Sequence, residues 1–247
     1  MGFLVALHFL TTLPVPIKSG LPDDAWGRSM AYFPLAGLVV GASLVVAGYL
    51  LSYLWPAPIA AAGMLGLWVV ITGALHLDGF ADCCDGLLVE KSPTDRLAIL
   101  HDPHIGTFGV AGLIVLLLLK YTCLLSGETA PFSLYRMLLL APVLSRWAMV
   151  YAAVVFPYGR AKGSLGSLFV LHVSRRSLMV SSIAAIIIAG LVGGWFGLAA
   201  LALTWIVMIG IARWTMTRIP GLTGDVYGAI NELTELAVLL LATAWPA

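Results

Sequence analysis

The stretch Gly73-Ala-Leu-His-Leu-Asp-Gly-Phe-Ala-Asp-Cys-Cys-Asp-Gly86 places three carboxylates within eight positions, directly after a long run of uncharged residues. The whole chain has only twelve acidic residues, so a quarter of them lie here. On a helix, Asp78, Asp82 and Asp85 have the spacing i, i+4, i+7 and fall within an arc of roughly 60° on one face. A face of this kind is suited to hold a cation.

The chemistry of these side chains indicates which cation it is. Carboxylates this close to one another repel and need a positive partner to stay ionised, above all beside a bilayer. Oxygen-only ligands favour a hard divalent ion, and Mg²⁺ usually rests on one or two carboxylates together with substrate phosphates and water. We therefore expect a Mg²⁺-dependent phosphoryl-transfer site. The alternative is a solvated acidic helix end, which the apolar flanks disfavour.

Composition indicates where the chain resides. Of its 247 residues, 61% are apolar and 10% are charged, and the mean hydropathy is +1.01. A soluble domain has about 25% charged residues. We predict an all-α, polytopic membrane helix bundle in which residues 1–247 form a single integral membrane domain. No basic tract with interleaved aromatic residues points to nucleic acid. The sequence leaves open whether the protein is a homo-oligomer.

Seven apolar segments are long enough to span a bilayer. They run approximately over residues 30–55, 57–77, 109–125, 132–156, 178–196, 198–219 and 226–245. The junction between the fifth and the sixth is tight, with only Gly193, Gly194 and Gly197 as turn residues, so six spans are the alternative. Before them, residues 2–13 are apolar but too short to span, and two prolines follow closely. This pattern predicts a short N-terminal helix that is interfacial or re-entrant.

The basic residues predict an orientation. Ten of the thirteen precede the first span or fall in alternate loops and span ends: Lys18, Arg28, Lys91, Arg96, Arg160, Lys162, Arg175, Arg176, Arg213 and Arg218. By the positive-inside rule, this side is the cytoplasm. We expect a multi-pass protein of the inner cell membrane, with its N-terminus and the acidic stretch on the cytoplasmic side, where nucleotides and Mg²⁺ are available.

A second acidic cluster opens the last span, in Gly221-Leu-Thr-Gly-Asp-Val-Tyr-Gly-Ala-Ile-Asn-Glu-Leu-Thr-Glu235. Four of its residues share a helix face of about 80°: Asp225, Gly228, Glu232 and Glu235. Glu232 and Glu235 would lie two to three turns into the span, where each unpaired charge costs on the order of 3 kcal/mol. We expect both to be buried against a partner. The alternative is a pair of neutral acids hydrogen-bonded within the bundle.

The loop after the first cluster closes with His101-Asp-Pro-His-Ile-Gly-Thr-Phe-Gly109. Gly106 allows the backbone to approach a ligand, Thr107 offers a hydroxyl, and the helix that follows presents free N–H groups to an anion. His104 is a candidate phosphate contact or proton shuttle. The alternative is a turn that only starts a helix.

Three basic residues lie inside predicted spans. We expect Lys120 and Arg136 to extend to an interface. Arg146 has apolar neighbours on both sides, so we expect it to face the bundle and to pair with an acidic residue or a phosphate. Lys162, in the loop over residues 157–167, is a candidate for reaching an anionic substrate.

Three blocks of the sequence carry a resemblance to a known family. Residues 76–86, 101–109 and 224–235 resemble, in this order, the signature blocks of the cobalamin synthases, and Phe9-Leu-Thr-Thr-Leu-Pro-Val-Pro16 is similar to the opening of that family. The resemblance covers nearly the full chain. It implies an integral membrane, Mg²⁺-dependent adenosylcobinamide-GDP ribazoletransferase. Such an enzyme joins adenosylcobinamide-GDP to α-ribazole or its 5′-phosphate and releases GMP, which completes the nucleotide loop of vitamin B12.

This reaction gives the acidic residues roles. We expect one or two Mg²⁺ ions on the diphosphate, held by Asp78, Asp82, Asp85 and Asp225. The ribose 3′-hydroxyl of α-ribazole would attack the phosphorus attached to the cobinamide arm, and GMP would leave. Glu232 is the first candidate for the general base and His76 the second, while Asp85 is either ligand or base. The expected contacts to substrate or cofactor are His104, Gly106, Thr107, Arg146 and Lys162.

Two other functions are weighed against this one. The acidic pattern also resembles that of CDP-alcohol lipid phosphotransferases, but here the spacing is D-x3-D-x2-D, no Ala-Arg follows, and Asp225 lies over a hundred residues away. An ion-coupled transporter would also carry intramembrane carboxylates, an arginine and glycine-broken helices. The acidic stretch is expected at a helix end and no internal repeat is evident, which favours the enzyme.

Overall fold

The computed structural model describes residues 1–17, 20–127, 131–159 and 165–245. In these ranges the chain forms helices joined by loops, and its only β-structure is one isolated bridge between Tyr158 and Leu222. The elements, in order, are α1 (Gly2–Leu10), α2 (Asp23–Ser29), the 3₁₀ turn η1 (Met30–Tyr32), α3 (Phe33–Leu54), α4 (Ala57–Thr72), α5 (Leu75–Leu87), α6 (Pro93–Ile99), α7 (Thr107–Ser126), α8 (Pro131–Val155), α9 (Leu165–Val170), α10 (Arg175–Gly193), α11 (Trp195–Met216) and α12 (Gly224–Ala244). The predicted all-α class is confirmed.

Six helices of the described chain are long and apolar enough to cross a membrane: Asp23–Leu54, Thr107–Ser126, Leu134–Val155, Arg175–Gly193, Trp195–Met216 and Gly224–Ala244. A seventh crossing forms if the bent pair of α4 and α5 is one span. The fifth and sixth predicted spans are separate helices, α10 and α11, that meet at Gly194. The protein is a multi-pass membrane helix bundle, as the apolar segments predict.

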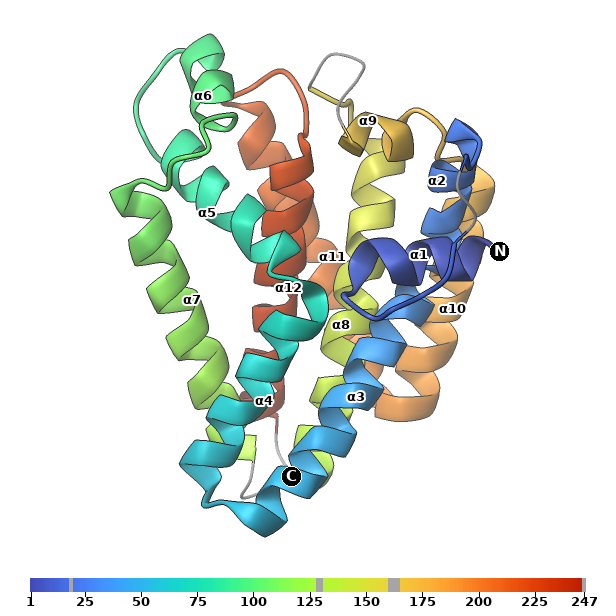
Figure 1. Cartoon of the computed structure of the whole chain (residues 1–247), viewed down its shortest axis with the longest axis vertical. Coiled ribbons are helices and arrows are strands. Elements are labelled where there is room, and N and C mark those ends of the chain that lie inside the picture. The colour runs from blue at the N-terminus through green and yellow to red at the C-terminus, as the bar shows by residue number, and fades with distance from the viewer. Residues whose placement is uncertain (18–19, 128–130, 160–164, 246–247) are drawn as a thin grey trace.

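The second predicted span departs from the expected continuous helix. The prediction carries this helix to residue 77, but α4 ends at Thr72 and α5 continues at an angle of 91°. Gly73 and Ala74 both adopt left-handed backbone angles, with φ of 61° and 56°. Glycine takes this conformation readily, whereas alanine does so at a cost of about 1–2 kcal/mol. The turn sends α5, which carries the acidic stretch, obliquely across the bundle (Figure 1).

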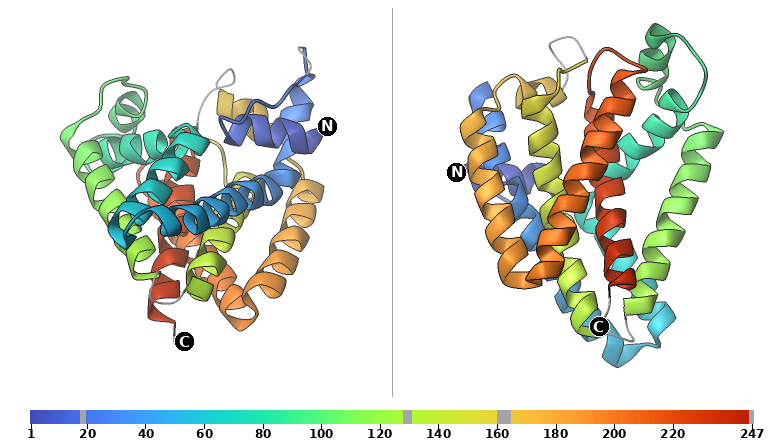
Figure 2. Two further views of the ribbon diagram at one scale, coloured as in Figure 1. Left: turned by 60° about the horizontal axis from the view of Figure 1, so that its bottom comes forward. Right: turned by 180° about the vertical axis from the view of Figure 1, so that it is seen from behind.

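Two helices form the centre of the bundle. About three quarters of the apolar window of α8 and of α12 is buried, 78% and 72%, against about a third or less for the other four spans. α8 packs against α3, α10, α11 and α12, and α12 also packs against α5 and α7 (Figure 2). The outer helices present apolar side chains outward, among them Val46, Leu118 and Ile187, as a lipid-facing surface requires.

The short N-terminal helix predicted from the sequence is present as α1. It lies across the bundle axis and does not span (Figure 1). Four of its side chains are buried, Val5, Ala6, Leu7 and Leu10. After it, the Thr12 N–H donates to the Ile71 carbonyl over 2.8 Å, which ties this segment to the end of α4.

The helices α5 and α12 approach each other at two glycines. A Cβ atom on Gly79 would lie 2.8 Å from the Asp225 Cα, and one on Gly228 would lie 2.9 Å from the His76 carbonyl oxygen. Only glycine allows two helix backbones to come this close. The contact brings the first acidic stretch beside the start of the second.

The substitution Gly228→Val tests this contact. The added side chain would force α5 and α12 apart, so we expect a loss of about 1–3 kcal/mol of stability and a lower thermal unfolding midpoint in detergent. The matched control is Gly210→Val on α11, because a Cβ on Gly210 meets no atom within 4 Å. Equal midpoints for the two variants would contradict a close α5–α12 contact.

Candidate functional site

A cavity of 220 Å³ lies where α5 and α12 meet, and residues far apart in the sequence line it. Its polar lining includes Asp78 and His76 from α5 and Asp225 and Tyr227 from α12. The rest of the described lining is Phe9, Met30, Phe33, Leu75, Gly79, Met149, Tyr158, Gly166, Phe169, Val170, Gly224 and Gly228. Two of the carboxylates singled out in the sequence therefore face one space.

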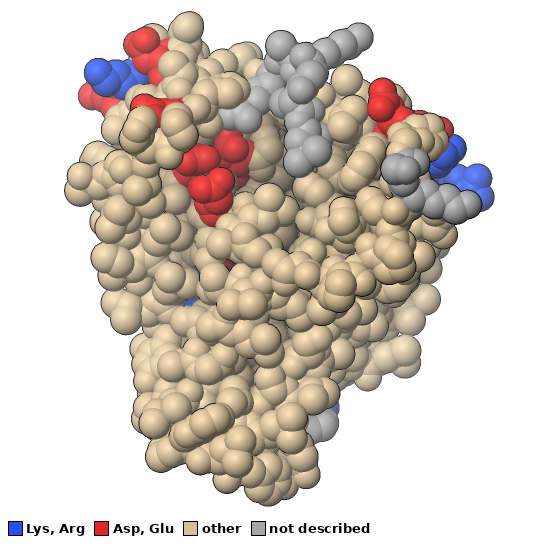
Figure 3. Space-filling view, in the orientation of Figure 1, with Lys and Arg blue, Asp and Glu red and all other residues tan. Residues whose placement is uncertain are grey.

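The acidic side chains gather at one end of the bundle. Asp78 is exposed, and its carboxylate forms no hydrogen bond or ion pair with another described residue. Asp82, one turn further along α5, and Asp225 are half-buried, and the Thr223 hydroxyl donates to Asp225 over 3.1 Å. Figure 3 shows acidic side chains clustered on this face over the end that carries α5 and α6. This end therefore offers carboxylate oxygens to a ligand.

Asp85 holds the loop that leads into α7. Its two carboxylate oxygens accept the backbone N–H groups of Gly106 and Gly109, over 2.7 and 2.9 Å. Gly106 is the N-cap of α7, so the carboxylate also meets the positive end of the helix dipole. The anion that these N–H groups bind is thus a side chain of the protein itself.

Two other predicted contacts of that loop lie outside the cavity. His104 is exposed, its Nδ1 lies 2.7 Å from an Asp102 carboxylate oxygen, and its backbone N–H donates to the same oxygen over 2.9 Å. These hydrogen bonds lower the pKa of Asp102. Thr107 is the first residue of α7 and is exposed. Lys162 lies outside the described residues.

A buried cluster of four charged residues connects α7, α8 and α12. The Lys120 ammonium lies 2.6 Å from a carboxylate oxygen of Glu232 and 2.6 Å from one of Glu235, and Arg146 pairs with Glu235. Each of the four residues is at most 4% exposed. Two positive and two negative charges balance, which is the condition for burying them in a membrane protein.

This ion cluster confirms part of the prediction and corrects another part. Glu232 and Glu235 are buried against partners, and Arg146 faces the bundle, as expected. The prediction that Lys120 extends to an interface is wrong. Two buried glutamates on α12 attract its ammonium inward, and the ring of Trp68 lies 4.7 Å from it.

The two candidate bases occupy different places. Glu232 lies in the ion cluster, bonded to Lys120, and does not line the 220 Å³ cavity. His76 lines that cavity, and neither of its buried ring nitrogens has a hydrogen-bond partner in the described chain. The geometry therefore favours His76 as the group able to accept a proton there.

The sequence did not reveal the aromatic part of the cavity wall. The ring centroids of Phe9 and Phe169 lie 4.2 Å apart, and those of Phe33 and Phe169 lie 5.9 Å apart. Tyr227 adds a buried ring on the α12 side. Phe9 and Tyr227 do occur inside the conspicuous blocks, but Phe33 and Phe169 resemble ordinary apolar residues of a helix.

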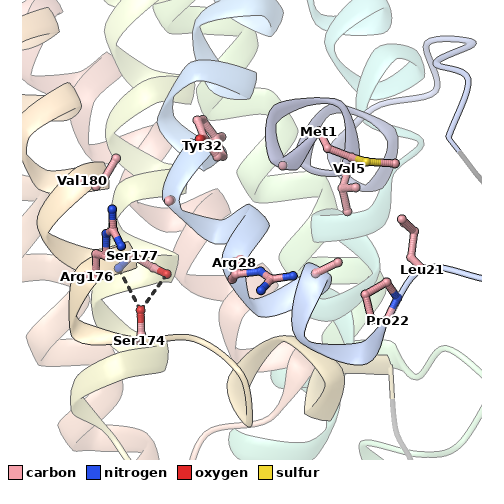
Figure 4. A pocket seen from close by; sticks show the side chains of 13 residues that line it. Met1, Val5, Leu21, Pro22, Arg28, Tyr32, Ser174, Arg176, Ser177 and Val180 are labelled. Atoms are coloured by element: carbon pink, nitrogen blue, oxygen red, sulfur yellow. Dashed lines mark hydrogen bonds between the residues drawn. The ribbon is translucent and has the colours of Figure 1, made fainter.

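A second, larger cavity of 460 Å³ has a different character. It lies between α1, α2 and the start of α10, and Figure 4 shows Arg28, Arg176, Ser174 and Ser177 around it. Its described lining contains no carboxylate and no imidazole. We therefore place the candidate functional site at the acidic cavity.

The fold and this cavity define a multi-pass membrane protein with an acidic, aromatic-lined site at one end of its helix bundle. The chain belongs to the cobalamin-5-phosphate synthase family, whose family model matches residues 2–243. The resemblance of the sequence blocks is thereby confirmed.

Curated relatives named adenosylcobinamide-GDP ribazoletransferase match almost the whole chain. The protein of Roseiflexus sp. (strain RS-1) is 39% identical over 96% of this chain and 87% of its own length. That of Geotalea daltonii is 34% identical over 98% and 96%, and that of Pseudomonas putida (strain W619) is 39% identical over 97% of both. No solved structure matches the chain.

Removing one partner from the ion cluster should be costly. Lys120→Met leaves two buried glutamates with one cation, so we expect a loss of about 3–5 kcal/mol and a clearly lower unfolding midpoint. Adding Glu232→Gln to Lys120→Met restores the charge balance and should recover much of that loss. If the double variant is less stable than Lys120→Met alone, the four charges do not act as one balanced cluster.

Proposed function

We propose that this protein is an adenosylcobinamide-GDP ribazoletransferase. It transfers the adenosylcobinamide phosphate group from adenosylcobinamide-GDP to α-ribazole or α-ribazole 5′-phosphate and releases GMP. Membership of the cobalamin-5-phosphate synthase family and the names of the relatives support this reaction. The observation that carries the site assignment is that Asp78 and Asp225, from different helices, line one cavity with His76.

We assign Mg²⁺ binding to this cavity, with Asp78 and Asp225 as ligands and Asp82 beside them. No group of three His, Cys, Asp or Glu side chains in the described chain is close enough to hold a metal ion alone. This arrangement suits an ion that shares its coordination with substrate phosphates and water, as Mg²⁺ usually does. When bound, Mg²⁺ would neutralise the charge of the diphosphate. Asp85 is assigned to the α7 loop, because both its oxygens are already engaged there.

The chain's own residues position the reactants and move the proton. We assign the general base to His76, since this imidazole lines the cavity and Glu232 does not. The acceptor hydroxyl gives its proton to His76, and its oxygen forms a bond to the phosphorus that carries the cobinamide arm. The bond from this phosphorus to the oxygen of GMP breaks. Most of the rate enhancement in such a transfer comes from positioning and charge neutralisation.

The distribution of basic residues supports an orientation in the membrane. Lys91 precedes α6 and Arg96 lies in it, and the Arg218 guanidinium donates to the Leu87 carbonyl at the end of α5, so all three belong to the end of the bundle that carries α6. The positive-inside rule then assigns this end to the cytoplasm, and we propose the inner membrane as the location. The two alternative functions, a lipid phosphotransferase and an ion-coupled transporter, have no support from the family comparison.

Asp78→Asn and Asp225→Asn test the metal assignment. Each removes a charged ligand, so we expect GMP release from adenosylcobinamide-GDP and α-ribazole to fall at least about 100-fold at fixed Mg²⁺. A Mg²⁺ titration should show a higher half-saturating concentration in any variant with residual activity. The control is Asp24→Asn, because Asp24 pairs with Arg28 at the surface. Unchanged Mg²⁺ dependence in both variants would contradict the assignment.

His76→Gln and Glu232→Gln separate the two candidate bases. Loss of a general base typically costs about 10²–10⁴-fold in turnover, so His76→Gln should lose turnover with an unfolding midpoint close to that of the wild type. Glu232→Gln should mainly lower the midpoint, because it removes a partner of Lys120. The opposite pattern, a folded but inactive Glu232→Gln variant and an active His76→Gln variant, would identify Glu232 as the general base.

A further inference from the structure

The wall of the acidic cavity divides into two chemically different parts. The part from α5 and α12 carries the carboxylates Asp78 and Asp225. The part from α1, η1, α3, α8 and α9 consists mainly of large apolar side chains: Phe9, Met30, Phe33, Met149, Phe169 and Val170. A ligand that fills this space must therefore be charged on one side and apolar on the other.

The apolar part is an ordered aromatic cluster. The ring centroid of Phe169 lies 4.2 Å from that of Phe9, 5.9 Å from that of Phe33 and 5.6 Å from that of Trp26. Phe33 and Phe169 are buried. Aromatic side chains that other rings already hold in place lose little conformational entropy when a further ring packs against their faces or edges. This part of the cavity is suited to a planar aromatic group.

On the α12 side of the cavity, one buried hydroxyl is left without a partner. Tyr227, two residues after Asp225, is 6% exposed, and its buried hydroxyl makes no hydrogen bond in the described chain. Buried polar atoms nearly always have a hydrogen-bond partner, and a buried donor or acceptor without one costs about 1–3 kcal/mol. The hydroxyl is therefore available to donate to a ligand in the cavity.

Both substrates of the proposed reaction carry aromatic bases, and the wall discriminates between them. The donor carries guanine and the adenine of its adenosyl group, and the adenine edge also presents donors and acceptors, N6 and N7 among them. Guanine presents several donors and acceptors along its edge, including O6, N7 and the 2-amino group, and a phenylalanine-rich wall would leave these unpaired. The base of α-ribazole is a benzimidazole, which has a single ring nitrogen free to accept a hydrogen bond. One tyrosine hydroxyl matches one ring nitrogen.

We infer that the aromatic part of the cavity is the acceptor subsite. It binds the base of α-ribazole against Phe33 and Phe169, with the Tyr227 hydroxyl donating to the free ring nitrogen, while the guanine of the donor stays outside. This inference rests on the proposed function and adds the position of the acceptor and a specificity-determining residue. With its base in this position, the ribose of the acceptor lies toward Asp78, Asp225 and His76.

Tyr227→Phe tests the hydrogen bond, because it removes the hydroxyl and keeps the ring. We expect the Kd of α-ribazole, measured by calorimetry without the donor, and its KM to rise about five- to tenfold. The KM of adenosylcobinamide-GDP and kcat at saturation should stay within about twofold, as expected when only ground-state acceptor binding is lost. Phe169→Leu should also raise the Kd and KM of α-ribazole and leave the KM of the donor within about twofold.

The matched control is Tyr151→Phe. Tyr151 is half-buried on α8 and packs against Trp147 and Trp205, but does not line the cavity. If Tyr227→Phe behaves like Tyr151→Phe, or if it raises the KM of the donor in place of that of the acceptor, the acceptor subsite is wrong.

A separate outcome distinguishes this failure from a failure of the proposed function. Wild-type protein that releases GMP, with both tyrosine variants unchanged, leaves the transferase in place and overturns only the subsite. Wild-type protein that shows a cooperative unfolding transition but neither binds α-ribazole nor releases GMP overturns both.

Discussion

The close contact of α5 with α12 is the constraint on which the rest of the structure depends. Gly79 and Gly228 remove the side chains that would separate the two backbones. The left-handed turn at Gly73 and Ala74 first directs α5 away from the course of α4. The contact with α12 then brings Asp78 and Asp225 to one cavity. Without the turn, the acidic stretch would continue through the bilayer; without the glycines, its carboxylates would stand apart from those of α12.

The helix α12 uses one face for two purposes at different depths. At its start, half-buried Asp225 faces the cavity. Two to three turns further on, Glu232 and Glu235 are buried and balanced by Lys120 and Arg146. Because an unbalanced charge at that depth would be costly, the deep pair holds α12 between α7 and α8. The shallow carboxylate lines the cavity instead.

The sequence predicts what depends on local pattern and misses what depends on distant contacts. Hydropathy located the spans, and helical spacing identified the charged face of α12. Nothing local distinguishes Ala74 as a left-handed residue, so the break between α4 and α5 was not foreseen. The carboxylates that pair with Lys120 lie on another helix, and Asp85 accepts hydrogen bonds from backbone N–H groups at the start of α7. The aromatic wall draws Phe33 and Phe169 from separate elements, and only their assembly makes them a surface.

The division of the cavity also bears on a problem that every phosphoryl transferase faces, which is the competition of water with the intended acceptor. An activated diphosphate beside carboxylates and an imidazole would be open to hydrolysis if water filled the cavity. The aromatic wall gains most from an apolar group that displaces water. If the acceptor base fills this wall, the same event brings in the hydroxyl and removes the competing nucleophile. Binding the acceptor in the apolar part, and leaving the donor at the acidic rim, therefore couples specificity for the acceptor to protection of the donor.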